Sequence, residues 1–326
     1  MIISRTPLRV SLFGGGSDMP AYYRRHGGTV LSTTIDKSVY VTVSRKFDDA
    51  VRVSYSRTEE VDRASEVEHP LVREALGLLG IEGGIEITSV ADIPARGTGL
   101  GSSSAFTVGL LNALHAFQGR HASAARLAEE ACEIEIERCG EPIGKQDQYA
   151  AAFGGFNLIR FHPDDTVEVT KLICPPGLLA ELQSRLLFFY TGVTRSASGL
   201  LGAQSANLAG PGSASDAASE LSCLAGSAFD SLRAGDLGPL GTMLDKAWRL
   251  KRRLAAGVST PRIDEAYAAA RAAGAEGGKL LGAGAGGFLM FLAPPDRHDA
   301  IRRALGALRE TPFALASQGS GIIFVH

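Results

Sequence analysis

Hydrophobic residues along the chain recur at two spacings, one typical of strands and the other typical of helices. An apolar run at Gly84–Val90 is followed by a loop rich in glycine. Beyond the loop, apolar residues recur at helical spacing on one face. They are Phe106, Leu110, Leu114 and Phe117. The pattern predicts a strand, a glycine loop and the start of a buried helix, in that order.

Strand-like patterns also occur elsewhere in the chain. The other expected strands are Ile2–Phe13, Val39–Phe47, Ala50–Tyr55, Phe156–Phe161, Thr166–Leu172 and Arg185–Tyr190. Asp48 and Asp49 separate the second and third of these, which predicts a β-hairpin. The fourth and fifth are expected to pair with each other.

Helical patterns alternate with these strands. The expected helices are Met19–Arg25, Pro70–Leu79, Ser123–Cys139, a short one after Lys145, and three more beyond residue 214. Thr260 is the predicted N-cap of the last helix, with Pro261 at its first position. Residues 196–214 are small and polar, and they are expected to be mobile. The whole pattern predicts an α+β protein in two halves.

Composition narrows the class of protein. The chain has 326 residues, 45% of them hydrophobic, and a net charge of −2, so nothing draws it strongly to nucleic acid or membrane. Its four cysteines form no C-x-x-C pair, which favours reduced thiols. Arg5 and Arg9 interrupt the first apolar segment, so it is not a signal peptide. We expect a cytoplasmic protein with small-molecule partners; a homodimer stays an open alternative.

The central glycine loop carries the strongest chemical signal. Its glycines let the backbone approach a ligand, and its serines fall at a helix N-terminus, which favours anions. This predicts a polyphosphate site with a serine hydroxyl near Mg²⁺. The residues expected to bind phosphate are Arg96, Gly97, Gly99, Leu100, Gly101, Ser102, Ser103 and Ser104.

Other interpretations of this loop stay open. Ser102 could be an ordinary N-cap in a plain turn. Ser103 could be the nucleophile of a serine hydrolase, because Gly101–Ala105 is one residue away from G-x-S-x-G. A Walker loop is excluded, because no Lys-Ser or Lys-Thr pair follows the glycines.

Two further glycine loops flank the central one. Gly14–Asp18 brings backbone and one carboxylate near a ligand, or else forms a tight turn in which Asp18 caps a helix. Gly282, Gly284 and Gly287 match G-x-G-x-x-G, but a strand-like run follows where a dinucleotide motif needs a helix. We therefore expect a loop that faces the central one.

Three segments carry a family resemblance: Pro7–Asp18, Pro94–Ala105 and Leu280–Gly287. In this order they resemble the three motifs of the GHMP kinases, such as galactokinase, homoserine kinase, mevalonate kinase and phosphomevalonate kinase. Within the family, the bacterial D-glycero-α-D-manno-heptose 7-phosphate kinases are the most similar. The stretches that carry this likeness are Thr6–Arg9, Gly14–Asp18, Gln146–Ala151, Phe153–Asn157 and Trp248–Lys251.

The resemblance implies a two-domain fold. Residues 1–180 would form an ATP-binding domain like domain 2 of ribosomal protein S5, and residues 181–326 a ferredoxin-like domain. ATP and a sugar would meet in the cleft between them.

The resemblance also implies roles for residues. Asp147 would act as base or orient the attacking hydroxyl, and Arg9 would stabilise the transferred charge. The metal ligands would be Ser103 and Glu135, with Glu137 as the alternative to Glu135. The substrate-binding residues would be Gly14, Gly15, Gly16, Ser17, Asp18, Arg195, Gly284, Ala285 and Gly286.

The implied activity is ATP- and Mg²⁺-dependent phosphorylation of the anomeric hydroxyl of a sugar phosphate. Gly15 and Gly16 replace the Glu-His of galactokinase, which argues against galactose and leaves room for a longer sugar. Arg195, Lys251 and Arg252 are candidates to bind its second phosphate. The alternatives are a kinase of a free fucose- or galactose-like sugar, a serine hydrolase with His298 or His326 as base, and a non-catalytic binding module.

Overall fold

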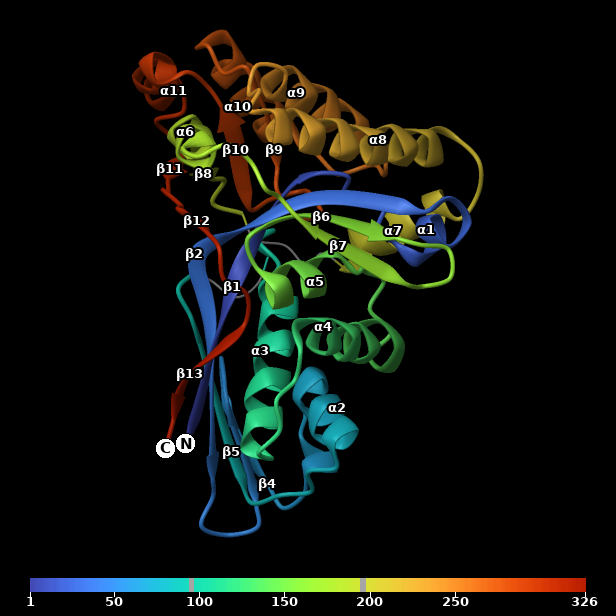
Figure 1. The fold of residues 1–326 in the computed structure, drawn as a ribbon, viewed down its shortest axis with the longest axis vertical. Coiled ribbons are helices and arrows are strands. Elements are labelled where there is room, and N and C mark those ends of the chain that lie inside the picture. Colours follow the sequence, from blue (N-terminus) through green and yellow to red (C-terminus); the bar gives the residue numbers. More distant parts are fainter. Residues whose placement is uncertain (94–96, 194–197) are drawn as a thin grey trace.

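A computed structural model describes residues 1–93, 97–193 and 198–326. The described chain forms two sheets with helices packed around them (Figure 1). The strands of the first sheet are β1 (Ile2–Phe13), β2 (Gly28–Arg45), β3 (Val51–Ser54), β4 (Thr58–Val61), β5 (Ile85–Ala91), β6 (Phe156–Phe161), β7 (Val167–Lys171), β12 (Leu315–Ala316) and β13 (Gly321–Val325). Those of the second are β8 (Leu186–Tyr190), β9 (Gly277–Leu280), β10 (Phe288–Leu292) and β11 (Arg309–Glu310).

The helices lie mostly on the faces of these sheets. The helices are α1 (Pro20–His26), α2 (Pro70–Leu79), α3 (Ser102–Phe117), α4 (Ala124–Cys132), α5 (Gln146–Phe153), α6 (Leu178–Ser184), α7 (Ser198–Leu208), α8 (Ser213–Ala234), α9 (Leu240–Lys251), α10 (Pro261–Ala272) and α11 (His298–Ala304). Short 3₁₀ turns cover Ala64–Glu66 and Pro295–Arg297, and a π-helix covers Glu133–Arg138. No helix in the described ranges combines the length and the hydropathy that crossing a membrane requires.

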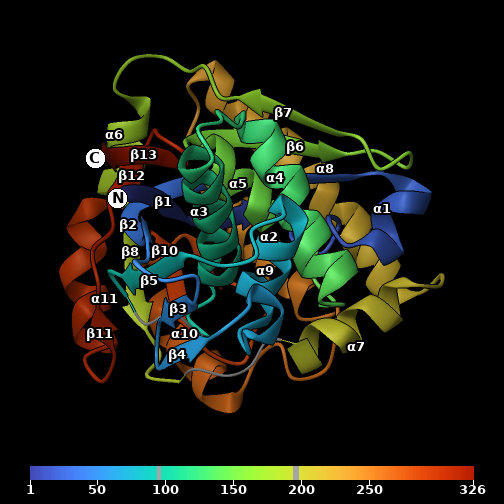
Figure 2. The same cartoon turned by 90° about the horizontal axis from the view of Figure 1, so that it is seen from below.

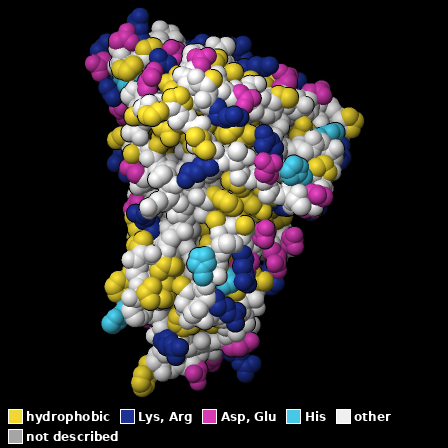
Figure 3. Space-filling view, viewed as in Figure 1, with side chains coloured by type: hydrophobic (Ala, Val, Ile, Leu, Met, Phe, Trp, Pro, Cys, Tyr) yellow, Lys and Arg dark blue, Asp and Glu magenta, His cyan; other side chains and the backbone are white. Residues whose placement is uncertain are grey.

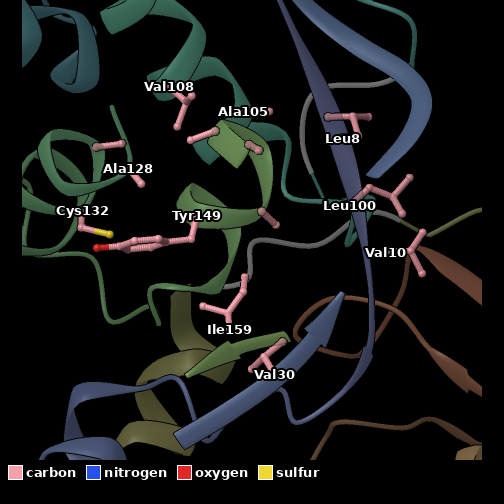
Figure 4. Packing of buried hydrophobic residues seen from close by; sticks show 14 of the residues in the cluster. Leu8, Val10, Val30, Leu100, Ala105, Val108, Ala128, Cys132, Tyr149 and Ile159 are labelled. Carbon is pink, nitrogen blue, oxygen red and sulfur yellow. The ribbon is translucent and has the colours of Figure 1, made fainter. Parts of the chain in front are cut away.

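The first sheet runs in the order β13-β1-β2-β5-β3-β4, with β6 and β12 also paired to β2 and with β7 paired to β6. Helix α3 packs against β1 and β2 and is flanked by α2, α4 and α5 (Figures 1 and 2). The core between these elements includes Leu8 and Val10 on β1, Val108 on α3 and Tyr149 on α5 (Figure 4).

The second sheet has the order β11-β8-β10-β9, and all of its pairs are antiparallel. When the four strands are numbered by their order in the chain, their order in the sheet is 4-1-3-2. This is the arrangement of a ferredoxin-like domain, which agrees with the expected fold class. Trp248 on α9 belongs to a second buried core, which also contains Phe189 and Phe291. This sheet and α8–α11 form the upper part of the molecule in Figure 1.

The predicted hairpin of Val39–Phe47 with Ala50–Tyr55 is wrong. Strand β3 pairs with β4 and, in parallel, with β5, so β5 lies between β2 and β3. The alternation of apolar and polar residues correctly identified both segments as strands. However, β5, which follows α2 in the chain, lies next to β2 in place of β3.

The segment at 196–214, expected to be mobile, is largely helical in its described part, and its mobility stays a prediction. Residues 198–208 form α7, and α8 begins at Ser213. Contacts with distant segments anchor α7: Gln204 donates to the carbonyl of Ala283 at 3.1 Å, and Asn207 donates to that of Leu254 at 2.9 Å. The small residues of this segment show no helical hydrophobic pattern, so the sequence did not predict the helix. Tertiary contacts hold it in place instead.

The chain end returns to the first sheet. Strand β13 pairs with β1, and β12 pairs with β2. Ser320 hydrogen-bonds to Thr6 at 2.8 Å and to Asn112 at 3.0 Å. The division at residue 180 stays a prediction, but residues 315–325 pair with the sheet of the first half and not with that of the second.

Candidate functional site

A cleft of about 1660 Å³ opens between the two halves of the molecule. Arg9, Gly99 and Asp147 line it from the first half, and Lys251 and Lys279 from the second. On the outer face drawn in Figure 3, positive and negative side chains are interspersed. The residues that line the cleft, by contrast, bring charged side chains of both halves together.

The central glycine loop and the loop after β9 face each other, as predicted, and pack together in the wall of this cleft. A Cβ atom on Gly282 would lie only 2.2 Å from Cα of Gly99, and one on Gly287 would lie 2.4 Å from the carbonyl oxygen of Thr98. Gly99 has φ +77° and Gly282 has φ +72°, a region that favours glycine. The second loop therefore closes against the backbone of the first.

Arg9 and Asp147 form a bidentate ion pair beside the central loop. Arg9 Nε donates to Asp147 Oδ1 at 2.7 Å, and a terminal nitrogen donates to Oδ2 at 2.5 Å. The other terminal nitrogen donates to the carbonyl of Gly99 at 2.6 Å. Arg9 is 5% exposed, whereas the Asp147 side chain keeps 23% of its surface exposed. The carboxylate is thus held at a fixed place in the wall of the cleft.

Glu135 is a buried carboxylate among hydroxyl groups. Its oxygens accept hydrogen bonds from Ser103 at 3.2 Å, Ser104 at 2.7 Å and Thr107 at 3.1 Å, and also from Gln148. Burial raises the pKa of Glu135 to about 7, although these hydrogen bonds act in the opposite direction. The described residues place no cation in an ion pair with it, so a bound cation would offset the cost of burying its charge.

This donor set fits Mg²⁺. Magnesium prefers oxygen ligands, and it is usually held by one or two carboxylates together with substrate phosphates. The Ser103 hydroxyl and the Glu135 carboxylate lie in hydrogen-bond contact in the wall of the cleft. Glu137 is exposed, so the geometry favours Glu135 over the alternative.

The Gly14–Asp18 loop divides into two parts. Gly15, Gly16 and Asp18 line the cleft. Gly14 and Ser17 lie behind them, where the Ser17 hydroxyl donates to the Gly14 carbonyl at 2.8 Å. Asp18 is 2% exposed, and burial, with a smaller contribution from the Asp147 charge, raises its pKa.

Other predicted substrate residues lie away from the cleft or outside the described residues. Gly284 and Ala285 pack against Val258, and Gly286 packs against Val193. The lining of the cleft contains the preceding Gly282 and Ala283 instead. Arg96 and Arg195 lie outside the described residues.

The histidines of the serine hydrolase alternative lie outside the cleft lining. The ring of His298 contacts the carbonyl of Ala293 at 3.2 Å, and His326 is exposed at the end of the chain. The Ser103 hydroxyl contacts a carboxylate, as described above. Nothing in this arrangement activates Ser103 as a nucleophile.

Two buried lysines complete the charged part of the cleft. Lys251 donates to the carbonyls of Leu280, at 2.8 Å, and Gly282. Lys279 donates to the carbonyl of Leu12 at 2.9 Å. Burial lowers both pKa values, that of Lys279 to about 7, and the nearby Arg9 charge acts in the same direction. No motif predicted Lys279, whose only signal is a lysine within a strand that ends at a glycine loop.

Aromatic side chains line another part of the cleft. The rings of Tyr55 and His69 lie 4.7 Å apart edge to face, and those of His69 and Phe106 lie 5.3 Å apart. No motif in the sequence indicated them. A planar ring, such as a nucleotide base, fits beside such a group.

A glycine loop at a helix N-terminus, a fixed arginine–aspartate pair and a buried carboxylate in one cleft define a site suited to phosphoryl transfer. Family models agree. The model described as "GHMP kinases N terminal domain" matches residues 41–155, and "GHMP kinases C terminal" matches residues 228–310.

Known proteins similar to the chain include other kinases. D-glycero-alpha-D-manno-heptose 7-phosphate kinase of Campylobacter jejuni is 30% identical over 96% of each chain. Galactokinase of Pyrococcus furiosus is 27% identical over 95% of this chain and 93% of its own. The crystal structure of a D-glycero-D-manno-heptose 1-phosphate kinase from Bacteriodes thetaiotaomicron superposes with a TM-score of 0.80 at 27% identity and covers 100% of both chains. The chain belongs to the GHMP kinase family.

Proposed function

We propose that the protein transfers the γ-phosphoryl group of ATP to the anomeric hydroxyl of D-glycero-D-manno-heptose 7-phosphate, which gives the 1,7-bisphosphate. The observation that carries this proposal is the bidentate Arg9–Asp147 pair next to the central glycine loop. The heptose phosphate is chosen because the chain matches the heptose 7-phosphate kinase over nearly its whole length.

The pair supplies what phosphoryl transfer requires, namely a positioned hydroxyl and stabilised charge. Asp147 orients the acceptor hydroxyl and accepts its proton as the new O–P bond forms and the bond to the β-phosphate oxygen breaks. Arg9 stays beside the transferred group and balances its negative charge. The backbone contact of Arg9 with Gly99 keeps both residues aligned with the phosphate loop.

The rest of the cleft supports a nucleotide in a defined orientation. Ser102–Ser104 place the N-terminus of α3 against its phosphates. The aromatic group of Tyr55, His69 and Phe106 lies beside its base. Ser103 and Glu135 are the residues that would hold Mg²⁺, which would neutralise phosphate charge when bound.

The acceptor lies on the other side of Asp147, against Gly15, Gly16 and Asp18. A cation for its second phosphate would come from Lys251, which lines the cleft, or from Arg195. Arg252 is a poorer candidate, because it pairs with Asp264 at 2.8 Å and lies over the ring of Trp248. A kinase of a free fucose- or galactose-like sugar is the second candidate, supported by the galactokinase relative.

An ADP-release screen over sugars and sugar phosphates tests this proposal. We expect kcat/KM for the heptose 7-phosphate to exceed that for free galactose or fucose by at least about tenfold, or about 1.4 kcal/mol. The heptose 1-phosphate should be inert as an acceptor, because its anomeric hydroxyl is blocked. Equal activity on free hexoses would overturn the assignment of a heptose phosphate.

A further inference from the structure

Two buried side-chain oxygen atoms in the acceptor part of the cleft lack a hydrogen-bond partner among the described residues. The hydroxyl of Ser11 and the amide oxygen of Gln146 have none among the described residues. Ser11 is only 6% exposed, yet both residues line the cleft. Buried polar groups are almost always satisfied, so these two call for a partner that the chain itself does not supply.

The positions of both residues follow from those of the ion pair. Ser11 comes two residues after Arg9 on β1, and alternation along a strand places both side chains on one face. Gln146 directly precedes Asp147 at the start of α5. Each element therefore contributes one charged residue to the ion pair and one neutral polar residue beside it.

Both side chains converge on Gly15. A Cβ atom built there would lie 3.5 Å from the Ser11 hydroxyl and 3.5 Å from the amide nitrogen of Gln146. The absence of a side chain at Gly15 leaves a small space that these two polar groups border.

Asp18 fixes which end of the Gln146 amide is available. Its carboxylate accepts from the amide nitrogen at 3.2 Å and from the backbone N–H of Gln146 at 3.3 Å. The remaining amide oxygen can only accept a hydrogen bond, whereas the Ser11 hydroxyl can donate or accept. The matching ligand group is a proton donor, which excludes a carboxylate or a carbonyl, and on a sugar that donor is a hydroxyl.

We propose that Ser11 and Gln146 form a hydroxyl-binding subsite over Gly15, which holds a second hydroxyl of the acceptor near the one that is phosphorylated. The subsite selects polyhydroxylated sugars over monoalcohols and carboxylic acids. It rests on the proposed function, because Arg9 and Asp147 mark where the reacting hydroxyl lies.

Two variants and one matched control test the subsite. Ser11→Ala removes one partner, and Gly15→Ala fills the space with a methyl group at ordinary contact distances. Each should raise KM for the sugar by about tenfold and leave KM for ATP unchanged. Ser32→Ala is the control, because Ser32 pairs with Ser11 in the sheet and its hydroxyl is also buried without a partner among the described residues, but it does not line the cleft.

Monodeoxy analogues of the accepted sugar, one for each hydroxyl other than the anomeric one that is phosphorylated, sharpen the test. For one analogue the wild type should lose about tenfold in kcat/KM, and Ser11→Ala should lose nothing further. A purely structural role of Ser11 would instead give the same loss on every analogue.

The outcomes separate the two proposals. If the wild type turns over the sugar and both variants keep its KM for the sugar, the subsite is overturned but the proposed function is not. The same conclusion follows if the loss caused by Ser11→Ala adds to the loss caused by the missing hydroxyl on every analogue. A wild type that turns over no sugar would overturn the proposed function, and the subsite with it.

Discussion

Asp147 owes its position to Arg9, whose three donor contacts span the carboxylate and the phosphate loop. Asp147→Asn keeps the size of the side chain but removes its charge and its ability to take a proton. We expect kcat to fall by roughly 10²–10⁴, the range for a lost acid–base group, with little change in KM for ATP. Steady-state kinetics with the preferred sugar measures both. Turnover near the wild-type rate would show that Asp147 does not have the assigned role.

The two candidate metal glutamates differ in burial. Glu135 is 1% exposed and contacts Ser103, whereas Glu137, two residues along, is exposed. Ser103→Ala and Glu135→Ala should each raise the Mg²⁺ concentration needed for half-maximal activity, because each removes an oxygen ligand. Glu137→Ala is the matched control and should change it little. A Mg²⁺ titration with the two glutamates in the reverse order would assign the ligand to Glu137.

Among the elements, the segment after Ser123 shows what a sequence pattern can and cannot specify. The predicted helix begins as expected, and Ser123 is its N-cap, since the Ser123 side chain accepts from the backbone N–H of Arg126. The alternation of glutamate and isoleucine that follows fits neither a strand nor an ordinary helix. The structure resolves this as a π-helix at Glu133–Arg138, in which the neighbours Ile134 and Glu135 are both buried. Sequence patterns predicted a helix here, but not its change of pitch.

The central glycine loop and the loop after β9 leave no room for a side chain where they meet. A methyl group on Gly282 cannot fit, because the backbone of Gly99 lies 2.2 Å from its Cβ position. We expect Gly282→Ala to separate the loops, lower the melting temperature and raise KM for ATP. Gly257→Ala is the control: its φ of +84° carries the same backbone strain, but no neighbour lies within 4 Å of its Cβ position.

Thermal unfolding and ATP kinetics of the two variants distinguish the effect of backbone strain from that of a steric collision between the two loops. Backbone strain alone costs about 1 kcal/mol in both. If Gly257→Ala raised KM for ATP as much as Gly282→Ala, the close approach of the loops would not explain the effect.

At the scale of the molecule, periodicity identified most strands and helices but not how distant ones pair. The facing glycine loops were predictable from the strand-like run after Gly287. The return of β12 and β13 to the first sheet was not, because β12 has two residues and β13 is largely exposed. The apolar run of β13 indicates a strand but not its partner, which contacts such as those of Ser320 decide.

Lys279 joins the two halves, because it extends from β9 in the second sheet to the carbonyl of Leu12 in the first. Burial lowers its pKa to about 7 in the folded protein, whereas in the unfolded chain it has the ordinary lysine value of 10.5. Between these values the unfolded chain binds a proton at Lys279 that the folded chain lacks. The free energy of unfolding therefore rises with pH from about 7 upward, and charging this buried amine destabilises the fold below pH 7.

Lys279→Met should make that pH dependence shallower, by up to about 1.4 kcal/mol per pH unit, the value for one linked proton. Lys246→Met, at a position on α9 where the lysine side chain is 56% exposed, is the control and should keep the wild-type slope. Urea unfolding of the ligand-free protein at pH 7, 8 and 9 gives the slopes directly. The slope is the informative quantity, because losing the hydrogen bond to Leu12 lowers stability equally at every pH. Equal slopes for Lys279→Met and the wild type would mean that Lys279 stays charged between the two halves.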